Sequence, residues 1–234
     1  MPRLVLAAAA AACLLPSAAD AHDAYWLKQS GGVHLIAWGH PGEAPGRYDV
    51  DAVLDAALYG PQGAPLDADR SEQDGQVRLA PSGDRTAAMA AFTFNPGDTI
   101  QTAEGRYTAG SKADHPGYRR AFHSVRFGKA LYAWSPRFAE PIGAELEWVP
   151  ADDPFSVTGP VTLQLLHEGA PLAGAEVTVS TGEAEQSLAT DADGRVAVSL
   201  AEAGETMIVA DHAIPIESET VDERALNAVL TIAR

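Results

Sequence analysis

Val161-Thr162-Leu163-Gln164-Leu165 alternates apolar and polar side chains, and Val196-Ala197-Val198-Ser199-Leu200 repeats this pattern further along the chain. Alternation with a period of two is typical of a β-strand that buries one face. Turn residues such as those of Thr190-Asp191-Ala192-Asp193-Gly194-Arg195 separate these runs, at intervals of about ten residues. The regular spacing of short strands and turns predicts a small antiparallel β-sandwich over residues 155–234.

The preceding part of the chain is also rich in strand-forming residues. Val33-His34-Leu35-Ile36-Ala37-Trp38 is a compact β-prone run. Asn95-Pro96-Gly97-Asp98 separates two further apolar runs and is predicted to be the turn of a hairpin. No segment has the long, capped pattern of an α-helix. The predicted fold class is therefore all-β.

Two prolines and two acidic residues interrupt the strand pattern at Pro150-Ala151-Asp152-Asp153-Pro154. This stretch predicts a boundary between two antiparallel β-sandwich domains of the immunoglobulin or transthyretin type. The predicted N-terminal domain spans residues 22–150, and the predicted C-terminal domain spans residues 155–234. A chain of this length is sufficient for one large domain or two small ones.

The first residues have the pattern of a cleaved signal peptide. The basic start Met1-Pro2-Arg3 is followed by an apolar run over residues 4–15 and by the small residues of Ala19-Asp20-Ala21. The apolar run is shorter than the roughly 20 residues that a membrane-spanning helix requires, and no later segment is apolar enough to cross a bilayer. We therefore expect cleavage after Ala21, a periplasmic protein that begins at His22, and no membrane-embedded segment.

Charge and cysteine content limit the partners of the protein. The formal net charge of the chain is -16 at pH 7, and such an acidic protein repels nucleic acid and attracts cations. The only cysteine, Cys13, lies in the predicted signal peptide. The mature chain is therefore expected to have neither a disulfide nor a thiolate metal ligand.

Imidazole is then the only nitrogen side chain for a borderline ion such as Ni(II), Co(II) or Cu(II). Cleavage after Ala21 exposes the α-amino group of His22, and this amine and the ring Nδ1 form a six-membered chelate with one ion. Asp23 supplies an oxygen ligand or orients the ring. The predicted metal site consists of His22, His40 and His123, with Asp23 as a helper and His115 as an optional fourth imidazole.

The remaining histidines are weaker candidates for metal ligands. His34 is expected to be half-buried in its strand, and His167 is expected to be solvated in a hairpin. His212, which ends a strand, is a weaker candidate than the histidines of the predicted site. His123 also has a second interpretation, because a strand over residues 122–127 turns its ring toward the interior or a cleft.

Several stretches of the chain together resemble the DUF4198 family. They include the predicted mature start, the passage at the predicted boundary and the turns of the last third, at residues 21–27, 39–40, 146–154, 169–177 and 190–195. This family is described as a periplasmic component associated with nickel and cobalt uptake, and the resemblance covers nearly the whole predicted mature chain. The second half also resembles the carboxypeptidase-regulatory, transthyretin-like module. The resemblance implies a metal-related role in the periplasm.

Signatures of common enzymes are missing from the sequence. The chain has no Gly-x-Ser-x-Gly elbow, no His-Glu-x-x-His pair and no phosphate-binding glycine loop. We expect a non-catalytic accessory protein that binds Ni(II) or Co(II) and hands it to a membrane transporter. Two alternatives stay open. One is a copper oxygenase that acts on polysaccharide and holds its ion by an amine and two imidazoles, and the other is a structural or glycan-binding β-sandwich.

Overall fold

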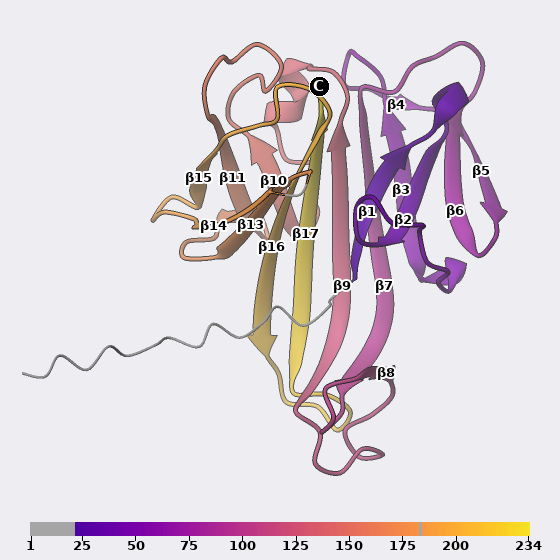
Figure 1. Cartoon of the computed structure of the whole chain (residues 1–234), viewed down its shortest axis with the longest axis vertical. Helices are drawn as coiled ribbons and strands as arrows, with labels where there is room; N and C mark the ends of the chain where they lie inside the picture. Colours follow the sequence, from indigo (N-terminus) through magenta and orange to yellow (C-terminus); the bar gives the residue numbers. More distant parts are fainter. Residues whose placement is uncertain (1–21, 183) are drawn as a thin grey trace, which may run out of the picture.

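The computed structural model describes residues 22–182 and 184–234, which form an almost entirely β protein (Figure 1). The predicted signal peptide lies outside the described residues. The all-β prediction is confirmed. In chain order the strands are β1 (Asp23–Lys28), β2 (His34–Gly39), β3 (Val53–Tyr59), β4 (Pro65–Leu66), β5 (Ala68–Gln73), β6 (Gln76–Pro81), β7 (Met89–Gln101), β8 (Tyr107–Ala109), β9 (Arg120–Leu131), β10 (Leu146–Pro150), β11 (Val161–His167), β12 (Ala170–Pro171), β13 (Glu176–Thr181), β14 (Ala184–Ala189), β15 (Arg195–Val198), β16 (Glu205–Pro215) and β17 (Glu223–Ala233).

Helical structure is confined to three short 3-10 turns in the described part of the chain, at Ser30–Gly32, Val50–Ala52 and Pro136–Ala139. Among residues 22–182 and 184–234, no helix has the length and apolar character needed to cross a bilayer. The frequent glycine and proline residues fit this pattern, because both end regular structure and form turns.

The strands form three sheets. The largest has nine strands in the order β14-β13-β16-β17-β9-β7-β3-β4, with β8 paired to the end of β7. A four-stranded sheet has the order β1-β2-β6-β5, and in a second one β11 pairs with β10, β12 and β15. Figure 1 shows the long strands β16, β17, β9 and β7 side by side through the centre of the molecule.

Strand pairing crosses the predicted domain boundary at residues 150–154 in two places. β10, which ends at Pro150, pairs with β11 on the other side of the boundary. β17, the last strand, lies parallel to β9 from Glu223, opposite Phe122, to Ile232, opposite Leu131. The two predicted regions therefore share sheets, and the boundary stretch belongs to a loop between two paired strands.

The predicted hairpin turn at residues 95–98 is wrong, because this segment is a bulge inside the long strand β7. From Phe94 to Gly97, β7 advances three residues while its partner β9 advances two. The Asn95 side chain accepts a hydrogen bond from the Gly97 N–H at 3.0 Å, and Gly97 has a φ of 84°. The residues that favour a tight turn are also those that favour a bulge with a left-handed glycine, so the local sequence fits both.

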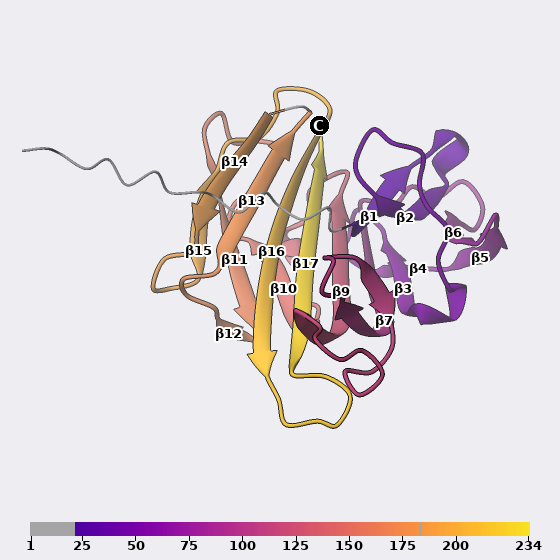
Figure 2. The ribbon, with the colours of Figure 1, turned by 60° about the horizontal axis from the view of Figure 1, so that its bottom comes forward.

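Both faces of the nine-stranded sheet are packed against a smaller sheet (Figure 2). One face, the sandwich face, contacts the β10-β11-β15 sheet through an apolar cluster that buries Trp148 and Leu165. The opposite face, the pocket face, contacts β1 and β2 through two smaller clusters that include Trp26, Phe92 and Val229. Removal of apolar surface from water, at about 25 cal/mol per Å², stabilises both contacts.

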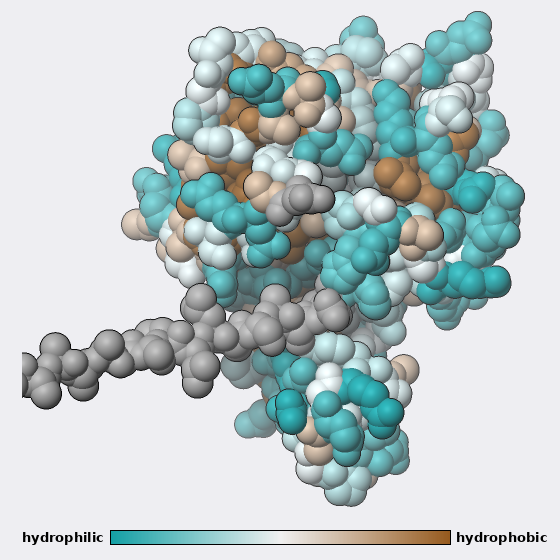
Figure 3. Space-filling view, viewed as in Figure 1, coloured by the Kyte–Doolittle hydropathy of each residue, from teal (hydrophilic) through white to brown (hydrophobic). Residues whose placement is uncertain are grey.

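Side chains of β9 alternate between these two faces. Val125 and Phe127 join the apolar cluster of the sandwich face, whereas Phe122, Ser124 and Arg126 line a cavity on the pocket face. The four long strands continue beyond the part that β1 and β2 cover. Figure 3 shows that the narrow lower part of the molecule, which these strand ends form, is largely hydrophilic. The pocket face is therefore both packed and, further along, accessible to ligands.

Candidate functional site

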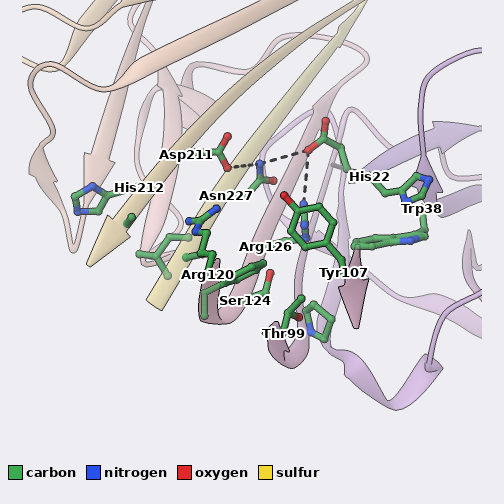
Figure 4. Close-up of a pocket in the computed structure, with 16 residues that line it drawn as sticks. His22, Trp38, Thr99, Tyr107, Arg120, Ser124, Arg126, Asp211, His212 and Asn227 are labelled. Carbon is green, nitrogen blue, oxygen red and sulfur yellow. Dashed lines mark hydrogen bonds and ion pairs between the residues drawn. The ribbon is translucent and has the colours of Figure 1, made fainter. Parts of the chain in front are cut away.

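A cavity of about 390 Å³ lies on the pocket face, next to the start of β1. Small-molecule sites typically have volumes of about 300–1,000 Å³. The long strands β7, β9, β16 and β17 form most of the wall, and His22, Trp38 and Tyr107 complete it (Figure 4). Figure 4 shows His22 and Trp38 at one end of this cavity and His212 at the other.

The pairing of β1 with β2 places His22 next to His40. Asp23 lies opposite Gly39 in this antiparallel pair, so the next positions outward, His22 and His40, also oppose each other. Directly opposed residues have Cβ atoms about 4.5–5.5 Å apart. The ring centroids of His22 and His40 are 5.2 Å apart, and the His22 ring is 5.9 Å from the Trp38 ring. The structure thus brings two of the predicted ligands together.

The spacing of the two rings matches that of two imidazoles on one metal ion. Metal–nitrogen bonds of about 2.0–2.1 Å that meet at an angle between a right angle and a tetrahedral one place the ring centroids about 4.5–5.2 Å apart. The Tyr25 hydroxyl donates a hydrogen bond to the His40 carbonyl oxygen at 3.2 Å and so holds the end of β2 in place. The spacing of the His22 and His40 rings is thus compatible with two imidazoles on one ion.

Four polar side chains, which we call the polar row, lie beside this pair of rings. Asp211, Asn227 and Arg126 occupy directly paired positions on β16, β17 and β9, and Asp23 approaches them from β1. Asn227 Nδ2 donates to Asp211 Oδ1 at 3.0 Å and to Asp23 Oδ1 at 3.4 Å. Arg126 Nη1 is 3.6 Å from Asp23 Oδ1. Figure 4 marks these contacts with dashed lines.

The polar row is incompletely hydrogen-bonded. Within the described part of the chain, Arg126 Nε and Asn227 Oδ1 are buried and have no hydrogen-bond partner. Asn227 is only 5% exposed, and the orientation of its amide is fixed because Nδ2 donates to two carboxylates. Burial raises the pKa of Asp23 to about 6, and the neighbouring Arg126 guanidinium opposes that rise. Buried polar groups are normally paired, so these two atoms are exceptions among the described residues.

Aromatic rings form the sides of the cavity. The Arg126 guanidinium lies 4.7 Å from the centroid of the Trp38 ring, and the Arg120 guanidinium lies 4.6 Å from that of Phe122. Tyr107 meets Phe122 edge-on at 6.2 Å between ring centroids. Cations are attracted to aromatic faces at such distances. The cavity thus combines apolar walls with guanidinium donors and carboxylate and amide acceptors, a composition suited to a small polar organic molecule.

His123 and His115 lie away from the His22 and His40 rings, which corrects the predicted set of four histidines. His123 belongs to the sandwich face of β9, and its Nδ1 is 2.7 Å from Asp98 Oδ1 on β7. The sheet itself therefore separates His123 from His22. His115 lies in the segment between β8 and β9, where it lines a different surface pocket beside Asp114 and Tyr118.

His34 is enclosed rather than half-buried. Its side chain lies against the Tyr132 ring at 4.8 Å and the edge of the Trp26 ring at 6.3 Å between centroids. Burial lowers the pKa of His34 to about 4, and the positive charge of Lys28 adds to this effect. A ring in this position is a neutral core residue with no route to a metal ion.

His167 and His212, which the sequence treats as separate, form a second pair of rings with centroids 4.8 Å apart. A nitrogen of His167 and carboxylate oxygens of Glu145 and Glu168 lie within 4.8 Å of one another. Arg224, however, donates two hydrogen bonds to Glu145, at 2.6 and 2.8 Å. One acid of this group is therefore already paired with a guanidinium.

Sequence reasoning missed the polar row apart from Asp23. Asp211, Asn227 and Arg126 come from three strands that are distant along the chain, and their proximity depends on strand pairing. A signal nevertheless exists, because each is a polar residue inside an apolar stretch, as in Leu226-Asn227-Ala228. A polar residue at a buried strand position has to be paired or to serve a ligand.

The fold and the cavity define an all-β protein with a cavity lined by polar and aromatic side chains on one face of a central sheet. The family model described as a domain of unknown function, DUF4198, matches residues 19–214, and the chain therefore belongs to this family. The chain is 25% identical over 166 residues to an uncharacterized protein of Haemophilus influenzae, and the match covers 70% of each of the two chains. No solved structure matches the chain.

Proposed function

We propose that the processed protein binds a divalent transition metal ion in the periplasm and serves metal uptake. Cleavage after Ala21 leaves His22 as the first residue, so that its amine and ring join the His40 ring in a set of three nitrogen ligands. The ion is Ni(II) or Co(II), and the protein passes it to a membrane transporter. The protein carries out no reaction on a substrate.

The 5.2 Å distance between the His22 and His40 ring centroids is the observation that carries this proposal. It follows from the register of β1 and β2 and requires no rearrangement of the sheet. Neutral imidazole and amine nitrogens are the forms that bind a metal ion. The net charge of -16 also raises the concentration of cations around the protein.

The geometry supports particular ligand residues more directly than it supports a particular ion or a physiological role. Nitrogen sites bind Cu(II) more tightly than Ni(II) or Co(II), whatever ion they serve. The choice of nickel or cobalt therefore rests on the association with uptake that the family resemblance implies. The same three nitrogens favour a copper oxygenase as the second candidate. A cavity of about 390 Å³ suits a small molecule better than a polysaccharide, which supports uptake.

Calorimetric titration with Ni(II) tests the ligand set. Three forms are compared: the chain that begins at His22, a version with one alanine before His22, and His40→Ala in the processed chain. We expect each change to weaken Ni(II) binding by about 100-fold or more, because a metal ligand is lost or its chelate ring is broken. His115→Ala, which removes an imidazole outside the site, is the matched control. Equal affinity of all forms would remove His22 and His40 from the proposal.

Metal content of the native host tests the physiological role. We expect cells without this protein to accumulate less nickel or cobalt, and we expect the wild-type chain but not His40→Ala to restore the level. Unchanged nickel and cobalt would contradict a role in uptake. Formation of oxidised sugars by the copper-loaded protein with a reductant would establish the oxygenase in its place.

A further inference from the structure

We propose that the cavity beside His22 binds an α-amino acid, which supplies the remaining ligands of the metal ion. The inference rests on the proposed metal site and names the small molecule that accompanies the ion. The protein offers three nitrogens, whereas square-planar and octahedral ions require at least four ligands. Because His22 is itself part of the cavity wall, the cavity is the space in which the remaining ligands lie.

The first requirement for the ligand comes from Asn227. Its Oδ1 is a buried acceptor without a partner among the described residues, and its Nδ2 is committed to Asp23 and Asp211. The amide oxygen therefore has room for an N–H or O–H donor. An amino acid loses its ammonium proton to solvent when the nitrogen binds the metal, and it keeps two N–H groups. One of these donates to Asn227, and the Asp211 carboxylate beside it accepts the other.

The second requirement comes from Arg126. Its Nε is buried and unpartnered within the described chain, and its approach to Asp23 is loose, at 3.6 Å. A carboxylate that binds the metal through one oxygen has a second oxygen free for this guanidinium, and such charge-assisted hydrogen bonds are strong. The charges of the ion and Arg126 then balance those of the amino acid, Asp23 and Asp211. A single α-amino acid can therefore form hydrogen bonds with both Asn227 Oδ1 and Arg126 Nε.

The size and the walls of the cavity favour an apolar side chain on this amino acid. A volume of about 390 Å³ exceeds what a hydrated ion fills, since one water occupies about 30 Å³. Beyond the polar row the wall includes the apolar side chains of Trp38, Phe122 and Leu226 and the Tyr107 ring, together with Arg120 and His212. Burial of an apolar side chain against these groups is favourable. Phenylalanine is accordingly the first probe.

The test uses the processed protein loaded with one equivalent of Ni(II). Phenylalanine is titrated by calorimetry and by the ligand-field spectrum of Ni(II), next to N-acetylphenylalanine and phenethylamine, which lack the free amine and the carboxylate respectively. We expect phenylalanine to bind and to change the spectrum, and the two analogues to bind at least about 100-fold more weakly, since each lacks one of the two metal ligands.

Variants of the polar row test the assigned contacts. Asp211→Asn, at the exposed end of the row, and Asn227→Leu are expected to weaken phenylalanine binding to the Ni(II) protein at least about tenfold. Glu185→Gln on the edge strand β14 removes the same charge as Asp211→Asn at a distance from the cavity, and we expect it to have no effect. Asp211→Asn keeps the test informative if the buried Asn227→Leu variant does not fold.

The outcomes separate this inference from the proposed function. If the spectrum of the Ni(II) protein stays unchanged at millimolar phenylalanine, the inferred binding of an amino acid is wrong, while the proposed metal site is unaffected. Equal binding of phenylalanine and N-acetylphenylalanine, or removal of Ni(II) from the protein by phenylalanine, also overturns it. A processed chain that binds no Ni(II) overturns both proposals.

Discussion

Two ion pairs involve β9 residues that lie three positions apart, on opposite faces of the central sheet. On the sandwich face, Lys129 Nζ is 2.6 Å from Glu147 Oε1 and donates to the Trp148 carbonyl oxygen at 2.8 Å. On the pocket face, Arg126 and Asp23 approach each other only to 3.6 Å. The side chains of the first pair are 7% and 2% exposed and those of the second 13% and 19%, and the pairs also differ in how completely they are hydrogen-bonded.

The two pairs differ in the partners of their remaining polar atoms. The Glu147 carboxylate also accepts hydrogen bonds from the backbone N–H groups of residues 142, 143 and 144, so that it is saturated by the protein itself. Arg126 Nε has no such partner in the described chain, and neither has Asn227 Oδ1. Removing one partner of a saturated buried pair leaves a buried charge uncompensated. The comparison therefore separates a cluster that the protein itself completes from one that has unpartnered atoms in the described chain.

Breaking the saturated pair is expected to have the largest effect on stability. Glu147→Gln leaves the Lys129 ammonium buried without its counter-charge, which costs about 3–5 kcal/mol of the free energy of unfolding. Urea denaturation measures this loss. Glu140→Gln, which removes an exposed acid 3.9 Å from Arg137, is the control and is expected to cost less than about 0.5 kcal/mol. A loss below 1 kcal/mol for Glu147→Gln would contradict the structural role of the pair.

His34 is a buried polar side chain whose Nδ1 has no hydrogen-bond partner among the described residues. Its pKa is about 4 in the folded protein, below the unfolded value near 6.5, so the unfolded chain binds the extra proton in this range. Stability is therefore expected to fall as the pH decreases from 6.5 toward 4, by about 2 kcal/mol from this group.

The difference between wild type and His34→Leu isolates this contribution from the titration of other groups. Urea denaturation at pH 7 and at pH 4.5 is expected to show that wild type loses about 2 kcal/mol more than the variant. An identical pH dependence in the two proteins would show that His34 is not held neutral by its surroundings.

Removing the acid of the incomplete pair is expected to have the smallest effect on stability. Asp23→Asn is predicted to change the free energy of unfolding by about 1 kcal/mol or less, because the contact with Arg126 is long, at 3.6 Å, and burial, which raises the pKa of Asp23 to about 6, already disfavours its charged form. The same change is expected to weaken Ni(II) binding about tenfold, as neighbours of metal ligands commonly do. If Asp23→Asn lost as much stability as Glu147→Gln and kept its full Ni(II) affinity, Asp23 would have a structural role and no role in metal binding.

Local patterns predicted the strands of this protein but not how they pair. The alternation of Val161-Thr162-Leu163-Gln164-Leu165 marks β11 correctly. Turn residues at positions 95–98 were compatible with a hairpin and with a bulge, and only the pairing of β7 with β9 decides between them. The parallel contact of β17 with β9 joins distant parts of the chain, and no local pattern encodes it.

The lack of a local signal for long-range strand pairing also explains which site residues could be predicted from the sequence. His22 and His40 lie just outside the ends of two neighbouring strands, where the register of a single antiparallel pair brings them together. Alternation correctly indicated that His123 shares a face with Val125 and Phe127, but that face is turned away from His22. Asn227 and Asp211 become neighbours of Arg126 only through pairing at long range, so sequence alone did not reveal them.

The number of nitrogens bound to a metal ion tests the central hypothesis most directly. Cu(II) is added in equimolar amount to the processed chain, and nitrogen couplings are counted by electron paramagnetic resonance. We predict three bound nitrogens, from the amine of His22 and the rings of His22 and His40, and two in His40→Ala. Fewer than three nitrogens in the processed chain, or the same number in His40→Ala, would contradict the proposed site.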